Sequence, residues 1–202
     1  MNRLLPLAEE IIQRHAEWTL RWHEAPAAPE TAAPWNCIER NHRMNFDLWH
    51  AEDEARRDDL GPEHVRNAKR TIDRRNQARN DAIEQMDVWL LRELPPLNTQ
   101  SPLRSETPGM MVDRLSIMSL KLYHMRIEAA RESAGEEHRR KSDERCKTLE
   151  EQLGDLTNCL KEFLAELETG KCRFKLYRQF KMYNDPSLNP QLYSRPELLK
   201  RD

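Results

Sequence analysis

The residues that break helices are confined to a few short stretches of this 202-residue chain. Only five glycines and twelve prolines occur, and most of the prolines fall before residue 35, within 95–108 or after residue 185. Because both residues interrupt helices, the intervening segments are free to be helical over long distances. We predict an all-α fold with helices over residues 4–24, 35–58, 62–93, 107–133 and 136–169.

Three of the expected helix ends carry local signals. Asp59 precedes Gly61-Pro62, and Thr107 places a capping hydroxyl before Pro108, a residue favoured at the first helical position. Gly170 is suited to the residue after a helix end, where a left-handed conformation is common. These signals support the boundaries at 62, 107 and 169.

The length and composition predict one domain. A chain of 202 residues matches a single antiparallel bundle of about five helices with an irregular C-terminal tail. We divide residues 1–202 into an N-terminal helix with an Ala/Pro linker (1–34), a main bundle (35–169) and a basic-aromatic tail (170–202).

Composition also narrows the location and the partners. No run approaches the roughly 18 uncharged apolar residues of a membrane span, and the acidic start does not resemble a secretory signal. The four cysteines show no CxxC spacing, which favours reduced thiols. We therefore expect a cytoplasmic protein without a membrane span.

The fifth predicted helix has one continuous apolar seam. Its members alternate in steps of four and three: Leu149, Leu153, Leu156, Leu160, Phe163 and Leu167. This spacing indicates a face packed within the bundle. The alternative is a contact surface between subunits of a homo-oligomer.

The second predicted helix carries polar residues on its apolar face. At about 100° per residue, one arc holds Trp35, Ile38, His42, Asn45, Phe46, Trp49, Asp53 and Arg56. If the apolar members face inward, the polar members are carried inward or to the margin. Buried polar groups need partners, since an unsatisfied one costs about 1–3 kcal/mol.

Hairpin geometry brings polar residues of three helices to one level. If the chain turns near residue 60, residues of the second and third helices lie at the same level when their numbers add up to about 120. If it turns near residue 100, residues of the third and fourth helices lie at the same level when their numbers add up to about 200. The second condition places Lys121 beside Arg79, His124 beside Asn76 and Asp113 beside Asp87. The candidate ligand-binding residues are His42, Asn45, Asp53, Lys69, Asp73, Asn76, Asn80, Lys121 and His124. They form either a ligand pocket or a hydrogen-bonded network that fixes the helix register.

No catalytic residues can be assigned from motifs. The chain has no Gly-rich phosphate loop, no GxSxG and no HExxH. A divalent metal is nevertheless a candidate cofactor: Glu84, Asp87 and Asp113 could hold Mg²⁺. His42 and His124 with Asp73 could bind a metal or act as base and acid.

The start of the tail alternates basic and aromatic residues. Lys171 to Tyr183 contains five cations and four aromatic residues and no acid. Such a pattern can bind nucleic acid, but a net charge of only −2 for the whole chain argues against that partner. We expect the aromatic residues to hold the tail against the bundle and the cations to meet acidic helices or an anionic ligand.

Five stretches resemble a bacterial family, domain-of-unknown-function family 4254. They are His42–Asp53, Lys69–Asp81, Glu106–Ser116, Lys121–Met125 and Phe180–Pro186. The resemblance implies no established activity. It does imply a link to glycosyltransferases of lipopolysaccharide and other surface-polysaccharide assembly, by association only.

Three hypotheses follow. The first is a ligand-binding or accessory protein in cell-envelope glycan assembly, with a sugar nucleotide or phosphorylated sugar as ligand and a glycosyltransferase as candidate partner. The second is a metal-dependent hydrolase acting on a phosphoester or nucleotide. The third is a structural, oligomeric interaction protein in which these polar residues only set the helix register.

Overall fold

The computed structural model describes residues 4–178 and 187–190 and is built from helices. In chain order they are α1 (Leu5–Glu24), α2 (Trp35–Glu54), the short 3₁₀ helix η1 (Asp58–Leu60), α3 (Pro62–Glu93), α4 (Pro108–Ala130) and α5 (Glu136–Glu168). No strand occurs in the described ranges, where Leu103 and Arg173 form one isolated bridge. The prediction of an all-α fold with five long helices is confirmed, although α2 ends four residues earlier than expected.

Local chemistry explains two helix ends. The Thr107 side chain accepts a hydrogen bond from the Met110 N–H, as the Thr-Pro sequence predicted. At the end of α5, Gly170 has φ +69°. There the N–H groups of Lys171 and Gly170 donate to the carbonyls of Glu166 and Leu167, the pattern of a Schellman cap.

The start of α3 differs from the expectation. Gly61, at φ +86°, is the residue before the helix, and no side chain caps it. Asp59 instead pairs with Arg57 at 2.8 Å. Pro62 then begins the helix at a position where its missing N–H costs nothing.

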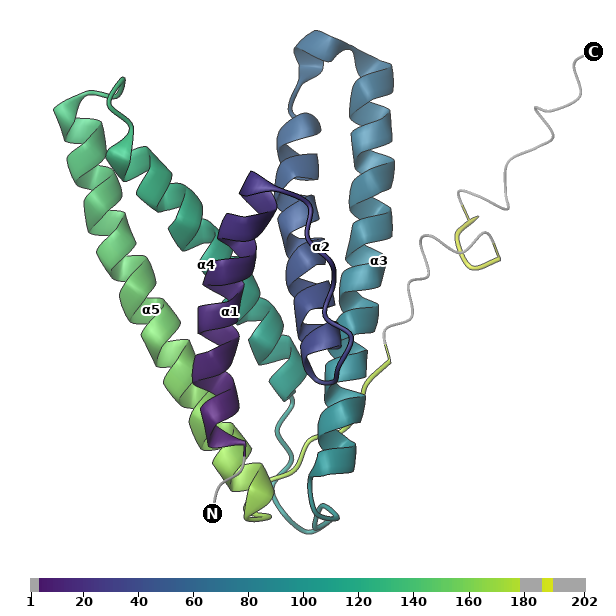
Figure 1. The fold of residues 1–202 in the computed structure, drawn as a ribbon. Helices are drawn as coiled ribbons and strands as arrows, with labels where there is room; N and C mark the ends of the chain where they lie inside the picture. The colour runs from purple at the N-terminus through teal and green to yellow at the C-terminus, as the bar shows by residue number, and fades with distance from the viewer. Residues whose placement is uncertain (1–3, 179–186, 191–202) are drawn as a thin grey trace, which may run out of the picture.

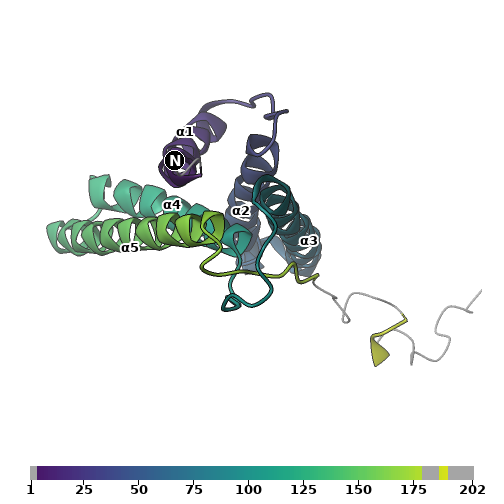
Figure 2. The same ribbon diagram turned by 90° about the horizontal axis from the view of Figure 1, so that it is seen from below.

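The helices form two hairpins that spread apart like a V (Figure 1). One hairpin is α2–α3 and the other is α4–α5. The view in Figure 2 shows that α1 lies over the α4–α5 hairpin. The converging end contains the helix termini at Trp35, Glu93, Pro108 and Glu168. The diverging end contains the termini at Glu54, Pro62, Ala130 and Glu136.

The register within the α2–α3 hairpin agrees with the prediction. Asp47 pairs with Arg75 at 3.0 Å, and Glu54 pairs with His64 at 2.8 Å. Both pairs lie close to the level that a tight turn near residue 60 requires. Counting residues from a short turn is therefore sufficient for this hairpin.

The main hydrophobic core lies toward the converging end and receives side chains from all five helices. Leu115, Leu160 and Leu167 are fully or almost fully buried in it. In the predicted α5 seam, the residues from Leu156 onward belong to this core, whereas Leu149 and Leu153 are only partly buried. The C-terminal half of the seam therefore packs within the protein.

A second, much smaller core lies within the α2–α3 hairpin. It consists of Leu48, Ala51 and Ile72, with Ala55 packed against it. Because this cluster joins only α2 and α3, it does not fill the space between the two hairpins. Polar side chains on that part of α2 can therefore face a hollow.

The first part of the tail is attached to the bundle. The Arg173 N–H donates to the Pro102 carbonyl at 3.0 Å, and Phe174 is buried beside Phe163. Tyr177 is 49% exposed. The other tail residues on which the prediction depends, Phe180, Lys181 and Tyr183, lie outside the described residues.

None of the helices in the described part of the chain is long and apolar enough to cross a membrane.

Candidate functional site

A buried carboxylate joins α2, α3 and α4. Asp113 on α4 accepts hydrogen bonds from the amides of Asn41 and Asn45, both at 2.9 Å, and from Nε of Arg79 at 2.7 Å. Its second oxygen accepts from Nη2 of the same guanidinium, so the ion pair is bidentate. This ion pair raises the pKa of Arg79, so the guanidinium is held permanently charged.

The network continues toward α1 through Ser116 and His42. Asn45 donates to the Ser116 hydroxyl at 2.9 Å, and that hydroxyl lies 2.8 Å from Nδ1 of His42. On its other side, Nε2 of His42 lies 3.0 Å from the His15 carbonyl and 2.9 Å from the Thr19 hydroxyl. Since a carbonyl only accepts, Nε2 carries the proton and Nδ1 accepts from Ser116.

His42 is therefore a neutral interior residue. Burial lowers its pKa to about 3, partly opposed by the His15 carbonyl. The His15 ring stacks on it with centroids 4.3 Å apart, and neither His15 nitrogen has a hydrogen-bond partner. Burial and the neighbouring His42 lower the His15 pKa well below its usual range. These two rings support the packing of α1 on α2.

Beside this network, a pocket of about 340 Å³ opens between α2, α3 and α4. Asn45 and Arg79 belong to both the network and the pocket wall. The full lining is Asn45, Leu48, Trp49, Glu52, Asp53, Arg56, Asn76, Arg79, Ile117 and Leu120. Its volume lies at the lower end of the range for small-molecule sites.

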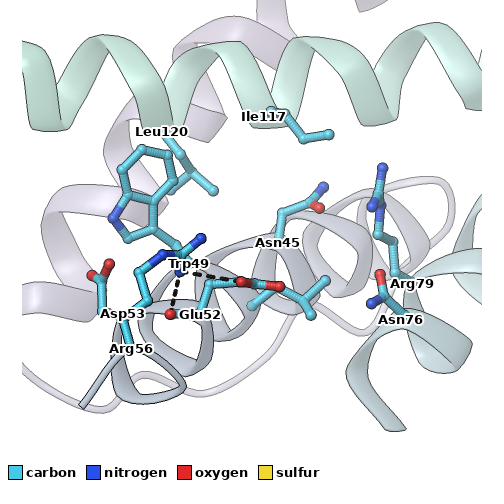
Figure 3. A pocket seen from close by; sticks show the side chains of 10 residues that line it. Asn45, Trp49, Glu52, Asp53, Arg56, Asn76, Arg79, Ile117 and Leu120 are labelled. Carbon is cyan, nitrogen blue, oxygen red and sulfur yellow. Dashed lines mark hydrogen bonds and ion pairs between the residues drawn. The ribbon is translucent and has the colours of Figure 1, made fainter. Parts of the chain in front are cut away.

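The charged groups of the pocket come from two helices. Figure 3 shows Trp49, Asp53 and Arg56 of α2 at one side and Asn76 and Arg79 of α3 at the other. Arg56 donates to the Glu52 carboxylate at 3.1 Å and also to the Glu52 carbonyl. The pocket thus offers two guanidiniums, two carboxylates, two amides and an indole within one concave surface.

Three of the nine predicted ligand-binding residues line this pocket: Asn45, Asp53 and Asn76. His42 lies in the interior network, and His124 packs against Trp49. Lys69 pairs with Asp73 at 2.6 Å on the exposed side of α3. Asn80 and the exposed Lys121 are also absent from the lining.

The predicted levels of α3 and α4 were wrong. Arg79 lies opposite Asp113, not opposite Lys121, and Asp87 accepts a hydrogen bond from the Gly109 N–H at 2.7 Å. The connection over residues 94–107 is long, and the two hairpins diverge, so α3 and α4 do not run side by side as a tight pair. Residue counting from an assumed turn cannot give the register in that case.

Trp49 has an aromatic support outside the pocket. The His124 ring lies parallel to the indole, with an interplanar angle of 1° and centroids 4.4 Å apart. His124 also contacts His23, His50 and Tyr123. Burial, followed by His23 and His50, lowers the pKa of His124, whereas Asp53 opposes that shift.

The three acids predicted for Mg²⁺ have separate surroundings. Asp113 is taken up by the network, and Asp87 is buried and bonded to the Gly109 N–H. Burial raises the pKa of Asp87 to about 6, although Thr107 and Gly109 oppose this. Glu84 lines another pocket beside Arg92. Within the described ranges, no group of three or more His, Cys, Asp and Glu side chains is arranged to hold a metal ion.

Sequence reasoning omitted several residues of the network. Asn41, Thr19 and Ser116 are buried and bonded, yet Asn41 lies outside the arc chosen on α2, and the other two were not among the predicted site residues. Arg79 was placed near the site only by the hairpin levels. A possible signal was its position one turn after Asn76 on the same face of α3.

Comparisons with known proteins identify one family. The family described as "Protein of unknown function (DUF4254)" matches residues 35–176, which contain α2 to α5 and the start of the tail. No curated protein and no solved structure matches the chain.

Proposed function

The chain belongs to the DUF4254 family, and we propose that it binds a sugar nucleotide or phosphorylated sugar in the pocket between α2, α3 and α4. The observation that carries this proposal is the combination of the Trp49 indole with charged and amide side chains around one hollow. Two members of the buried network, Asn45 and Arg79, also line this pocket.

The lining matches the chemistry of a charged sugar. The flat apolar face of a sugar ring can lie on an indole, which is large, rigid and apolar. Carboxylates and amides, here Glu52, Asp53, Asn45 and Asn76, accept from or donate to hydroxyl groups. Guanidiniums bind phosphate oxygens in a planar, bidentate manner.

The two guanidiniums have different freedom to bind a ligand. Arg79 is only 26% exposed at its side chain and is held by Asp113, so it presents a fixed positive edge. Arg56 is 69% exposed and pairs with Glu52, an exchangeable surface partner. We therefore assign the incoming phosphate to Arg56 first and treat Arg79 as the fixed background charge.

The cellular role extends this proposal. We place the protein in the cytoplasm as an accessory protein of envelope glycan assembly, with a glycosyltransferase as its partner. The support for this context is the family resemblance, and the four unpaired cysteines agree with a reducing compartment. The interior network supports the register role of the third hypothesis for His42, alongside the pocket.

Calorimetric titration tests the proposal with four probes: UDP-glucose, glucose 1-phosphate, glucose and inorganic phosphate. We expect the two phosphorylated sugars to bind measurably and the two fragments much more weakly. Trp49→Ala and Arg56→Ala should each weaken binding by about tenfold or more, since the loss of one strong contact is worth about 1.4 kcal/mol.

Arg57→Ala is the matched control, because Arg57 is adjacent to Arg56 but pairs with Asp59 and does not line the pocket. The Arg57→Ala variant should bind the phosphorylated sugars with the same affinity as the wild type. If no probe binds, or if Arg56→Ala and Arg57→Ala behave alike, the pocket assignment is wrong. Release of glucose phosphate or phosphate that requires a divalent metal would instead favour the hydrolase hypothesis.

A further inference from the structure

The aromatic wall of the pocket is backed by a titratable ring. Trp49 borders the pocket and His124 does not, while the two rings stack in parallel at 4.4 Å. His124 can therefore affect the pocket only indirectly, by its contact with the Trp49 indole. A change in the charge of the imidazole acts on the surface that a ligand would meet.

His124 belongs to a cluster of three imidazoles at the diverging end. His23 of α1, His50 of α2 and His124 of α4 lie with ring centroids 5.5, 5.7 and 6.1 Å apart. Three imidazoles at such distances resist multiple protonation, because each positive charge opposes the next. His23 accordingly lowers the pKa of both His50 and His124, and His50 lowers that of His124.

The groups that face these rings come from three helices. His124 has His23 from α1, His50 and Asp53 from α2, and Tyr123 from its own helix. His50 additionally has Asp47 and Arg43. Asp53 is the acid common to both rings, and it also lines the pocket.

One nitrogen of His124 is poised for protonation. Its Nε2 is buried and has no hydrogen-bond partner. Burial lowers the pKa of both His124 and His50, and the neighbouring imidazoles add to this, so these two rings are neutral near pH 7. An anion bound beside Trp49 would offset that unfavourable environment by adding negative charge nearby.

We propose that His124 is a positioning residue of the pocket. Its ring holds the Trp49 indole in its orientation, and its charge state sets the affinity of the pocket for an anionic ligand. This inference rests on the proposed function and specifies its regulation. By thermodynamic reciprocity, a ligand that favours protonated His124 must itself bind more tightly when that proton is present. Affinity therefore rises as the pH falls.

UDP-glucose is the appropriate probe because its diphosphate diester keeps the same charge from pH 5.5 to 8.5. We expect the wild type to bind it about three- to tenfold more tightly at pH 5.5 than at pH 8.5, the effect of one charge at partly screened distance. His124→Phe keeps a flat ring behind Trp49 but has no nitrogen to protonate. It should bind as the wild type does at pH 8.5 and show no increase at low pH.

His138→Gln is the control, since His138 is an exposed residue of α5 that pairs with Glu128. It should retain the wild-type pH profile. A His124→Phe profile as steep as that of the wild type would overturn the inference while leaving ligand binding intact. A wild type that binds UDP-glucose at no pH contradicts the proposed function instead.

The contact between His124 and Trp49 also has a readout without ligand. A protonated imidazole quenches the fluorescence of a stacked indole, so the emission of Trp49 should decrease as the pH is lowered. That emission is obtained by subtracting the spectrum of Trp49→Phe from the spectrum of the wild type. His124→Phe should abolish that fall. If the Trp49 emission responds to pH equally with and without His124, the inference is wrong whatever the ligand. Thermal melting of each variant confirms that the protein is folded.

Discussion

The two ends of the molecule treat their polar groups in opposite ways. At the converging end all five helices share one core, and Asn41, His42, Asp113 and Ser116 form hydrogen bonds with other buried side chains beside it. At the diverging end the α2–α3 hairpin keeps a core of only three residues, and polar side chains line a hollow. The same kinds of residue are structural at one end and available to a ligand at the other.

Helix α2 contributes polar residues both to the buried network and to the pocket. Its middle contributes Asn41, His42 and Asn45, which are almost fully buried and bonded to α1 or α4. Its second half contributes Glu52 and Asp53, which are exposed at the pocket. The difference teaches that the identity of a polar residue on an apolar face does not reveal its role; the covering helices decide it.

The largest expected effect is at the buried carboxylate. Asp113→Ala leaves the Arg79 guanidinium and the Asn41 amide without their acceptor, while Asn45 keeps Ser116, and should lower the free energy of unfolding by about 3–5 kcal/mol. Asp73→Ala, which breaks a pair exposed on α3, should cost no more than about 0.5 kcal/mol. Urea denaturation measures both, and similar costs for the two variants would contradict the contrast drawn above.

The pH dependence of stability comes second. His15 and His42 have pKa values lowered by burial, so the unfolded chain takes up protons below its ordinary histidine pKa of 6.5 while the folded chain does not. Their stabilising contribution is present above pH 6.5 and is lost as the pH falls. Asp87, with its pKa raised to about 6, acts in the opposite direction between pH 4 and 6.

Several histidines with lowered pKa against one carboxyl group with a raised pKa mean that the protein loses stability as the pH falls from 6 to 4. His15→Leu removes one of the histidines, and the ring it replaces has no hydrogen bond to lose. That variant should lose stability less steeply than the wild type over this range, measured by denaturation at each pH. An unchanged slope would mean that His15 is not buried in neutral form.

The third effect concerns the close contact of α3 and α4. A Cβ at Gly109 would lie 2.7 Å from the Ile83 carbonyl and 2.8 Å from an Asp87 oxygen. Gly109→Ala should therefore destabilise the protein by about 1–3 kcal/mol. Gly154→Ala on α5 meets nothing within 4 Å and should stabilise by about 0.5–1 kcal/mol. Effects of the same sign would show that the hairpins do not meet as described.

The smallest effect is predicted for two lysines that hairpin geometry assigned to the site. Lys69→Ala and Lys121→Ala should leave the dissociation constant for UDP-glucose within about twofold, because neither lysine lines the pocket and distant surface charges are screened. Calorimetry at physiological ionic strength measures this. A large loss in either variant would place the ligand farther out on α3 or α4 than the pocket.

Part of this fold follows from short-range sequence signals. Pro108 with Thr107, and Gly170 after α5, mark helix ends because capping and φ preferences are properties of a few neighbouring residues. The register of α2 on α3, seen in the Asp47–Arg75 pair, follows from a short turn. The mixed face of α2 also indicated correctly that His42 and Asn45 point inward.

The sequence by itself thus determined the helices, the first hairpin and the inward polar residues of α2. Only the tertiary structure decided that His42 is sealed beneath α1 and that Asp53 borders a pocket. It also decided that Arg79 meets Asp113. The physical reason is that these outcomes depend on the angle between two hairpins and on where α1 ends. Both are set by packing between residues far apart in the chain, which no local pattern encodes.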